Sequence, residues 1–471
     1  MEKQPAIKSY FFGKGYKELG NTLAESWYRN VASAKSYWTK TDYFWSREPW
    51  FFWAFVAVGT AFAALSVIIF GTVFFMALSA IHITILASFF LTIYLSFSLL
   101  WGTDKVYRLS RRVFLACPIC HFKADLPHYR CPSCGDIHSR LIPSSYGILK
   151  RKCQCGNKLP TTFFNGRSKL PAFCPNCQHE IKTGEATPIC IPIVGGPSVG
   201  KTCFLFSAVK SFIEEVAPQN AWNIRFLDRQ NEVIYHRVSQ NFSKGIVPAK
   251  TAELTPTAFN FFVSSKRWTP EKIMYFYDAA GESVKSSELL VRHKFFNYFH
   301  GLIFIIDPFS IPELMADYER SLEHYDKAIK PSDMMLDDAF DTMIINLEKS
   351  YKVRRDQTIN KPCAIVINKV DAFDLSERIG EAGAMELMKL DSSIATIADA
   401  IDKLCKDNFI EWGLGNFIRN LESKLTNYRF FTCSALGHLP DSENKAFQAY
   451  GATEPLLWLL SQIDKKAFPS P

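Results

Sequence analysis

The sequence predicts an α/β domain that follows a cysteine-rich segment and a two-helix transmembrane hairpin. Three observations predict this order. Residues 50–101 contain no Asp, Glu, Lys or Arg, and eight of the 13 cysteines fall into four close pairs. After these pairs, short apolar runs alternate with stretches of helical pattern, as expected of an α/β fold. At 471 residues the chain is too long for one ordinary core, and we divide it into residues 1–49, 50–103, 104–185 and 186–471.

The uncharged stretch is too long for one membrane crossing. As a helix it would measure about 78 Å, more than twice the roughly 30 Å hydrocarbon core. We therefore expect helices at 50–76 and 81–101 with a turn at 77–82. Lys and Arg flank both ends and are absent from the turn, which predicts that both termini and the α/β domain are cytosolic. Ahead of the hairpin, aromatic residues alternate with Lys at loosely helical spacing, which favours a position along the inner membrane surface.

Residues 104–185 are the basic part of the chain, whose overall net charge is +8. They contain 14 Lys and Arg against 5 Asp and Glu. A basic segment beside a membrane favours anionic headgroups as its partner. Nucleic acid is the alternative partner, because a phosphate backbone attracts the same charge.

The cysteine pairs have the spacing of zinc ligands. Two thiolates from one tight turn and two from another close a tetrahedral site with no open position, so such a metal is structural. The clustering also favours a reducing compartment over a disulfide framework. We expect two tandem zinc ribbons, each using four consecutive cysteines. The first comprises Cys117, Cys120, Cys131 and Cys134, and the second Cys153, Cys155, Cys174 and Cys177.

An apolar run at 189–194 leads into a glycine-rich loop and then into a helical stretch. The pattern Gly-x-x-x-x-Gly-Lys-Thr in this context predicts a phosphate-binding loop. Its backbone N–H groups and the helix N-terminus face a phosphate, Lys201 reaches the β and γ oxygens, and Thr202 ligates Mg²⁺. The nucleotide-binding residues here are Gly195, Gly196, Pro197, Ser198, Val199, Gly200, Lys201, Thr202 and Cys203.

A second element, Asp-Ala-Ala-Gly, follows the apolar run at 273–277. Asp278 at the end of a strand beside the loop can hold the Mg²⁺ shell through water. The backbone N–H of Gly281 can then reach the γ-phosphate. This element therefore adds a second group of Mg²⁺ and phosphate contacts.

Two further elements predict that the base is guanine. Asn368, Lys369 and Asp371 close the apolar run at 363–368. A carboxylate at Asp371 can accept from both guanine N1–H and the N2 amine, a donor pair that adenine lacks, while the stem of Lys369 stacks on the base. After the run at 428–433, a backbone N–H can meet guanine O6 from the loop formed by Ser434, Ala435 and Leu436.

These four elements, in this order, resemble those of the Ras-like (TRAFAC-class) P-loop GTPases. The resemblance implies a Mg²⁺-dependent switch that binds and hydrolyses GTP. It also implies a threonine that caps Mg²⁺ ahead of the strand at 258–263; Thr257 fits, and Thr255 and Thr251 are alternatives. The sequence departs from the family at Glu282, where such enzymes commonly carry Gln. A carboxylate there repels the γ-phosphate, so we expect slow intrinsic hydrolysis, with Glu282 or a partner's residue orienting water.

The spacings between the four elements leave room for added helices at 311–329 and 384–417. Together with the ribbons and the hairpin, these insertions make the chain similar to the double-GTPase proteins proposed in bacterial conflict systems. That similarity implies a companion GTPase or effector as partner, and a role in defence or signalling. The alternative is a nucleotide-dependent assembly protein, or a nucleic-acid-binding effector, with little turnover.

Overall fold

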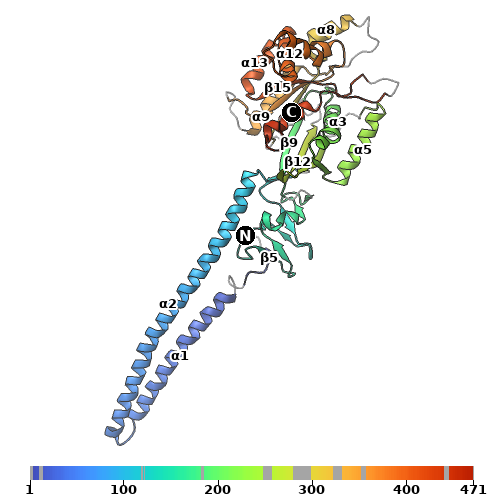
Figure 1. Cartoon of the computed structure of the whole chain (residues 1–471). Coiled ribbons are helices and arrows are strands. Elements are labelled where there is room, and N and C mark those ends of the chain that lie inside the picture. The colour runs from blue at the N-terminus through green and yellow to red at the C-terminus, as the bar shows by residue number, and fades with distance from the viewer. Residues whose placement is uncertain are drawn as a thin grey trace. The chain divides into compact units, whose positions relative to one another are not determined.

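The structure is a computed structural model of the chain (Figure 1). Contacts divide the chain into two compact units, Met1–Ser110 with His128–Phe173, and Arg111–Pro127 with Cys174–Pro471. We call these the hairpin–ribbon unit and the α/β unit. The residues described are 4–9, 14–117, 120, 122–181, 185–247, 257–278, 299–321, 331–351, 357–439 and 445–469.

Two long antiparallel helices dominate the hairpin–ribbon unit, α1 (Lys14–Trp45) and α2 (Trp50–Ser110) (Figure 1). Near the turn that joins them, the rings of Phe44 and Trp53 stack with centroids 5.4 Å apart. Farther along, the Thr41 and Thr60 hydroxyls are 2.8 Å apart. Several buried or partly buried α1 side chains recur at spacings of three, four or seven residues, as in a coiled coil. They are Leu23, Trp27, Asn30, Ala34, Thr41 and Phe44.

The predicted turn at 77–82 is wrong, because α2 runs unbroken through it. Residues 77–82 contain neither Gly nor Pro, so nothing in this segment interrupts the helical hydrogen bonds. The partner of α2 is α1, not the second half of the same apolar stretch. Among the described residues, α2 is the one helix long and apolar enough to cross a membrane, judged by length and composition.

The chain ahead of α1 pairs with the ribbon. Ile7 N donates to Lys152 O at 2.9 Å, and Gln154 N donates to Pro5 O at 3.2 Å. Residues 1–49 therefore include a short extended segment bound to the ribbon and a helix packed on α2. The ribbon strands in this unit are β3 (His128–Arg130), β4 (Ile137–His138), β5 (Lys150–Lys152), β6 (Lys158–Pro160) and β7 (Ala172–Phe173).

The far end of α2 is also fixed to the ribbon, through a buried ion cluster. Asp104 accepts from Arg167 Nη2 at 2.9 Å and from Arg108 Nε at 3.2 Å. The side chains of Asp104 and Arg167 are both fully buried, and Phe163 N donates to the same carboxylate at 2.8 Å. Because a buried charge is costly without its partners, this cluster holds the last turns of α2 against the ribbon.

A seven-stranded sheet forms the centre of the α/β unit, in the order β10-β11-β12-β9-β13-β14-β15. The strands from β12 to β15 are mutually parallel, and β10 and β11 add in antiparallel fashion at one edge. The central strand β9 carries the glycine-rich loop at its carboxyl end. The strands are β9 (Thr187–Val194), β10 (Asn223–Phe226), β11 (Thr257–Ser265), β12 (Trp268–Asp278), β13 (Leu302–Ile306), β14 (Cys363–Ile367) and β15 (Tyr428–Thr432).

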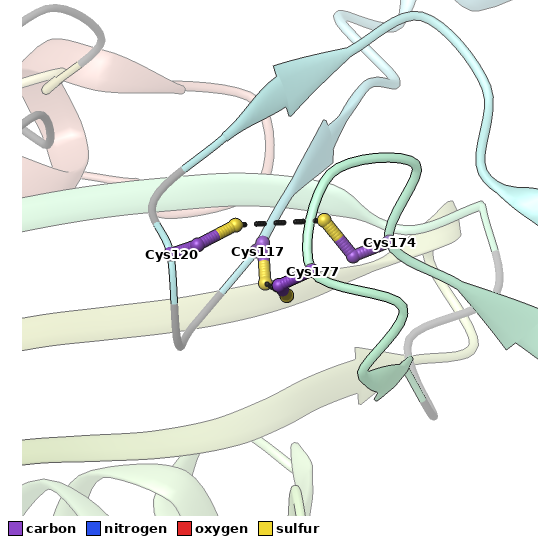
Figure 2. A group of neighbouring side chains, drawn as sticks. All are labelled: Cys117, Cys120, Cys174 and Cys177. Carbon is purple, nitrogen blue, oxygen red and sulfur yellow. Dashed lines mark hydrogen bonds between the residues drawn. The ribbon is translucent and has the colours of Figure 1, made fainter.

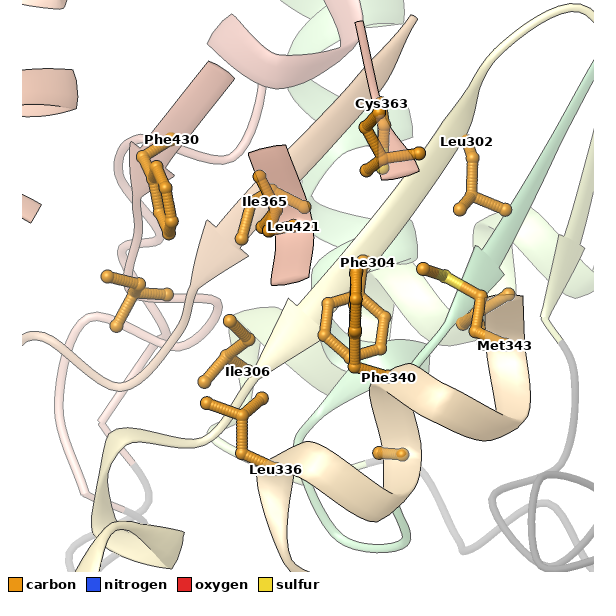
Figure 3. Packing of buried hydrophobic residues seen from close by; sticks show 14 of the residues in the cluster. Leu302, Phe304, Ile306, Leu336, Phe340, Met343, Cys363, Ile365, Leu421 and Phe430 are labelled. Carbon is orange, nitrogen blue, oxygen red and sulfur yellow. The ribbon is translucent and has the colours of Figure 1, made fainter. Parts of the chain in front are cut away.

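Helices cover both faces of this sheet. Alternation along β13 sends Phe304 and Ile306 to one face and Ile303 and Ile305 to the other. On the first face, the rings of Phe304 and Phe340 meet edge to face at 5.8 Å (Figure 3). That face is covered by α8 (Pro312–Ser321), α9 (Leu336–Tyr351), α12 (Ile397–Glu411) and α13 (Gly415–Lys424), and the other by α3 (Lys201–Ser211), α5 (Arg229–Ser243) and α14 (Glu454–Ile463).

The short elements of the α/β unit complete the chain. Asn231 N donates to the Asp228 side chain at the start of α5, and Asp399 N donates to Thr396 at the start of α12, as N-caps do. The predicted helical insertion at 384–417 is three helices, of which α11 is the first. The remaining elements are β1 (Leu115–Ala116), β2 (Lys123–Ala124), β8 (Glu180–Ile181), the π-helical turn η4 (Phe212–Val216), α4 (Ala217–Gln219), η6 (Pro308–Ser310), α10 (Leu375–Arg378) and α11 (Glu381–Leu390).

Candidate functional site

The glycine-rich loop lies between β9 and α3. Gly200, the residue before α3, has φ +90°, a conformation that side chains with a Cβ rarely adopt. A Cβ at this position would collide with the Asn368 side chain. The loop therefore needs glycine here for both its conformation and its close approach to Asn368.

Lys201, at the first turn of α3, folds back over the loop. Its Nζ donates to the carbonyls of Gly195 at 3.1 Å and Gly196 at 2.7 Å. The side chain is largely buried. A buried ammonium beside a row of backbone N–H groups at a helix N-terminus is suited to phosphate.

Asn368 connects three parts of the site. It follows β14, and its Nδ2 donates to Val199 O in the glycine-rich loop at 2.9 Å. Its Oδ1 accepts from Ala435 N at 3.1 Å. Ser207 of α3 adds a further link, because its Oγ donates to Ala435 O at 2.7 Å. The structure thus brings the predicted phosphate loop and the two predicted base elements together at the carboxyl edge of the sheet.

Lys369 is held by a residue that the sequence analysis missed. Its Nζ lies 2.6 Å from Oδ2 of Asp307, the residue that follows β13. Asp307 is fully buried and also accepts from Phe309 N at 3.1 Å and from Ser332 N at 3.0 Å. Ser332 in turn donates its hydroxyl to Pro197 O in the loop at 2.7 Å. The clue in the sequence was an Asp directly after the apolar run at 302–306, the same position that Asn368 has after β14.

Asp371 lies on the side of the loop that contains Ser434. Burial and then the charge of Asp371 raise the pKa of Tyr450 to about 12, and Val370 N, one residue before Asp371, donates to Cys433 O at 3.3 Å. Tyr450 pairs with Ser434 through two backbone hydrogen bonds of 3.0 Å. The Ala435 N–H is already engaged by Asn368.

The predicted Mg²⁺ ligands fall partly outside the described residues. Asp278 ends β12, where its backbone pairs with Ile193 of β9 and with Thr257 of β11. The register thus puts Asp278 and Thr257 opposite each other beside the strand that carries the loop. The side chains of these two residues are not described, and Thr251, Thr255, Gly281 and Glu282 lie outside the described residues.

All eight predicted cysteines gather into two groups of four, but the partition differs from the tandem one. Cys117 and Cys120 join Cys174 and Cys177 in the α/β unit (Figure 2). The hairpin–ribbon unit contains the other group, so the first and last pairs enclose the middle two. Pair spacing does not decide between these arrangements, because any two such turns can face each other. The second group is Cys131, Cys134, Cys153 and Cys155.

Both groups fit zinc. The sulfur atoms in each lie within 4.8 Å of one another. Cys120 and Cys174 are separated by 3.5 Å and Cys131 and Cys155 by 3.7 Å, close to the about 3.8 Å edge of a tetrahedron with 2.3 Å Zn–S bonds. Burial acts to raise the pKa of Cys120, but hydrogen bonds to its sulfur, chiefly the one from Asn176, lower that pKa to about 6. This thiol is therefore readily available as the thiolate that a metal requires.

Two solved structures are similar to this chain at low identity. No family model and no curated protein matches the chain. The Arl6 BBS3 small GTPase from Trypanosoma brucei, with a bound nucleotide analogue, is 14% identical at a TM-score of 0.26, covering 59% of this chain and 99% of that one. Methanosarcina barkeri Roco2 RocCORdC bound to GDP is 12% identical at a TM-score of 0.24, covering 59% of this chain and 50% of that one.

Proposed function

We propose that the chain is a guanine-nucleotide switch that binds GTP and GDP with Mg²⁺ and hydrolyses GTP slowly. The observation that carries this proposal is the position of Asn368, which links the phosphate loop to both base elements. In this proposal Lys201 neutralises the phosphates and Asp371 accepts the two guanine donors. Thr202, Thr257 and Asp278 would hold Mg²⁺, which would supply charge neutralisation at the phosphates.

Hydrolysis in this proposal depends on positioning and charge. The segments around Gly281 and Thr257 contact the γ-phosphate and relax when it is lost. In the sequence, Glu282 takes the position where Ras-like GTPases commonly carry Gln, so turnover is slow unless a partner contributes a residue. Zn²⁺ at each cysteine group holds the ribbon segments together and takes no part in the chemistry. The companion GTPase or effector predicted from the sequence remains part of the proposal.

Asp371→Asn tests the choice of base. An amide at this position loses the acceptor for the guanine amine and gains a donor that suits the C2 carbonyl of xanthine. We expect GDP affinity to fall and xanthosine diphosphate affinity to rise, measured by competition against a fluorescent GDP analogue. Asp374→Asn, in the same segment, is the matched control and should leave both affinities unchanged. If Asp371→Asn still binds GDP more tightly than xanthosine diphosphate by the same factor as the natural protein, Asp371 does not contact the base.

We also propose that the hairpin brings the protein to a membrane. Its support is the uncharged stretch of α2, whose large apolar side chains are mostly exposed. An apolar surface of this extent requires a cover of lipid or protein. Flotation of the full-length protein with phospholipid vesicles tests this, and recovery of the protein in the lipid-free fraction contradicts it.

A further inference from the structure

The two outer faces of the hairpin differ in character. On the face that points away from α1, α2 exposes large apolar side chains. Residues 50–103 contain no charged residue. The outer face of α1 carries charged side chains together with exposed aromatic residues such as Tyr28 and Tyr43. Arg29 and Glu25 pair there, with side chains 79% and 65% exposed. The exposed charged residues of α1 are Lys14, Lys17, Glu18, Glu25, Arg29, Lys35, Lys40 and Asp42.

We propose that the hairpin is an in-plane anchor: α2 lies in one leaflet of a phospholipid membrane without crossing it, and the outer face of α1 stays in water. This inference rests on the proposed membrane association and is independent of nucleotide binding. It replaces the two crossings expected from the sequence with none.

The length of α2 is the first reason. The uncharged part measures about 78 Å as a continuous helix, and fitting it across a roughly 30 Å core requires a tilt of about 67° from the membrane normal. Spanning helices tilt by about 0–40°. A helix of this length that does not break therefore lies closer to the membrane plane than to its normal.

The attachment of both hairpin ends to the ribbon is the second reason. Ile7 is bound to Lys152 ahead of α1, and Asp104 is bound to Arg167 at the end of α2. The chain between them must therefore cross a membrane an even number of times. With α2 unbroken, two crossings require α1 to be one of them. The charges spread along α1 make it a poor spanning helix, because a charged side chain is costly at the centre of a bilayer.

The groups at the ends of the apolar stretch favour lipid over a second protein chain as its cover. At the turn, the Arg47 guanidinium lies 5.0 Å from the Trp53 ring. At the other end, Lys105 Nζ lies 5.1 Å from the Trp101 ring. Trp beside Lys or Arg is typical of the membrane–water interface. An in-plane helix would place both of these ends at one interface.

A matched pair of substitutions tests which face meets lipid. Trp27 contacts Phe75 across the hairpin, and Tyr28 and Val73 lie at this level on the outer faces of α1 and α2, 71% and 61% exposed. We expect Val73→Asp to lower the partition of full-length protein onto phosphatidylcholine–phosphatidylserine vesicles about tenfold. Tyr28→Asp should stay within about twofold. Equal effects of the two changes, or no effect of either, overturn the proposal; zinc content and helical circular dichroism verify that both variants fold.

Site-directed probes test whether the hairpin crosses. An environment-sensitive fluorophore is attached through Val73→Cys, Tyr28→Cys or Ser46→Cys, with the parent protein labelled in parallel to measure reaction of native thiols. In-plane binding predicts that brominated lipid quenches the Val73 probe, and that iodide added outside sealed vesicles quenches the other two. A probe that iodide reaches only after the vesicles are permeabilised shows a crossing. If brominated lipid does not quench the Val73 probe and two copies of the protein cross-link through α2, a second copy covers the apolar face. Either result contradicts the proposal, and nucleotide binding measured on the same samples is judged separately.

Discussion

Asp307→Asn tests how the predicted base site is held in place. The substitution keeps the shape of the side chain and one oxygen acceptor, but it removes the charge that faces Lys369 Nζ at 2.6 Å. A hydrogen bond to a charged group contributes about 1.5–3 kcal/mol. Lys369 is 23% exposed and can regain water, so we take the lower end, about 1.5 kcal/mol. If Lys369 must be held there to contact the nucleotide, the GDP dissociation constant rises about tenfold.

The assay is a titration with a fluorescent GDP analogue, beside a thermal melt of the same protein. For a domain of this size, 1.5 kcal/mol lowers the melting temperature by about 3–6 °C. Lys369→Met should add little to Asp307→Asn, because both remove the same contact. Asp341→Asn removes a carboxylate that accepts from Asn420 at the surface, and it should change neither quantity. A lowered melting temperature with unchanged GDP affinity refutes the positioning role and leaves Asp307 purely structural.

Three further predictions concern the metal groups, pH and hydrolysis. Cys117→Ser with Cys174→Ser should remove one zinc by elemental analysis, whereas Cys117→Ser with Cys131→Ser should remove both; the tandem partition predicts the reverse. Burial and the nearby cations lower the pKa of His300 to about 3. Between about pH 3 and 6.5 the unfolded chain therefore binds one proton more than the folded chain, and the free energy of unfolding falls as the pH is lowered through this range. The neutral ring accepts from Cys190 N. Urea unfolding at pH 6.5 and at pH 5 should show about 1.6 kcal/mol of lost stability that His300→Gln lacks; equal losses contradict this. Glu282→Gln should speed single-turnover GTP hydrolysis, and a slower rate would mean that the carboxylate itself orients water.

Much of the α/β unit followed from the sequence. The apolar runs before Gly195 and Asn368 became the strands β9 and β14, and parallel strands bring their carboxyl ends to one edge. Asp307 was missed because a lone Asp after an apolar run is uninformative until the order of the strands is known. Its importance comes from Lys369 and Ser332, which lie far from it in the chain.

The cysteine partition and the hairpin failed for a different reason. Each cysteine pair forms a similar turn, and neither spacing nor the nearest strand pairing decides the partner: Tyr129 pairs with Ala172, yet Cys131 and Cys174, which follow these strands, belong to different groups. The composition shows that residues 50–101 contain no charged residue, but it does not specify whether lipid or protein covers them. The predicted break at 77–82 was inferred from membrane thickness, while the local sequence contains no helix breaker.

Calorimetric titration of the purified protein with GDP and with ADP, each with Mg²⁺, tests the central claim most directly. Two hydrogen bonds from guanine to a carboxylate contribute about 3 kcal/mol or more, so the account predicts GDP binding at least about a hundredfold tighter than ADP. Equal heats and affinities for the two nucleotides, or no binding of either, would contradict it.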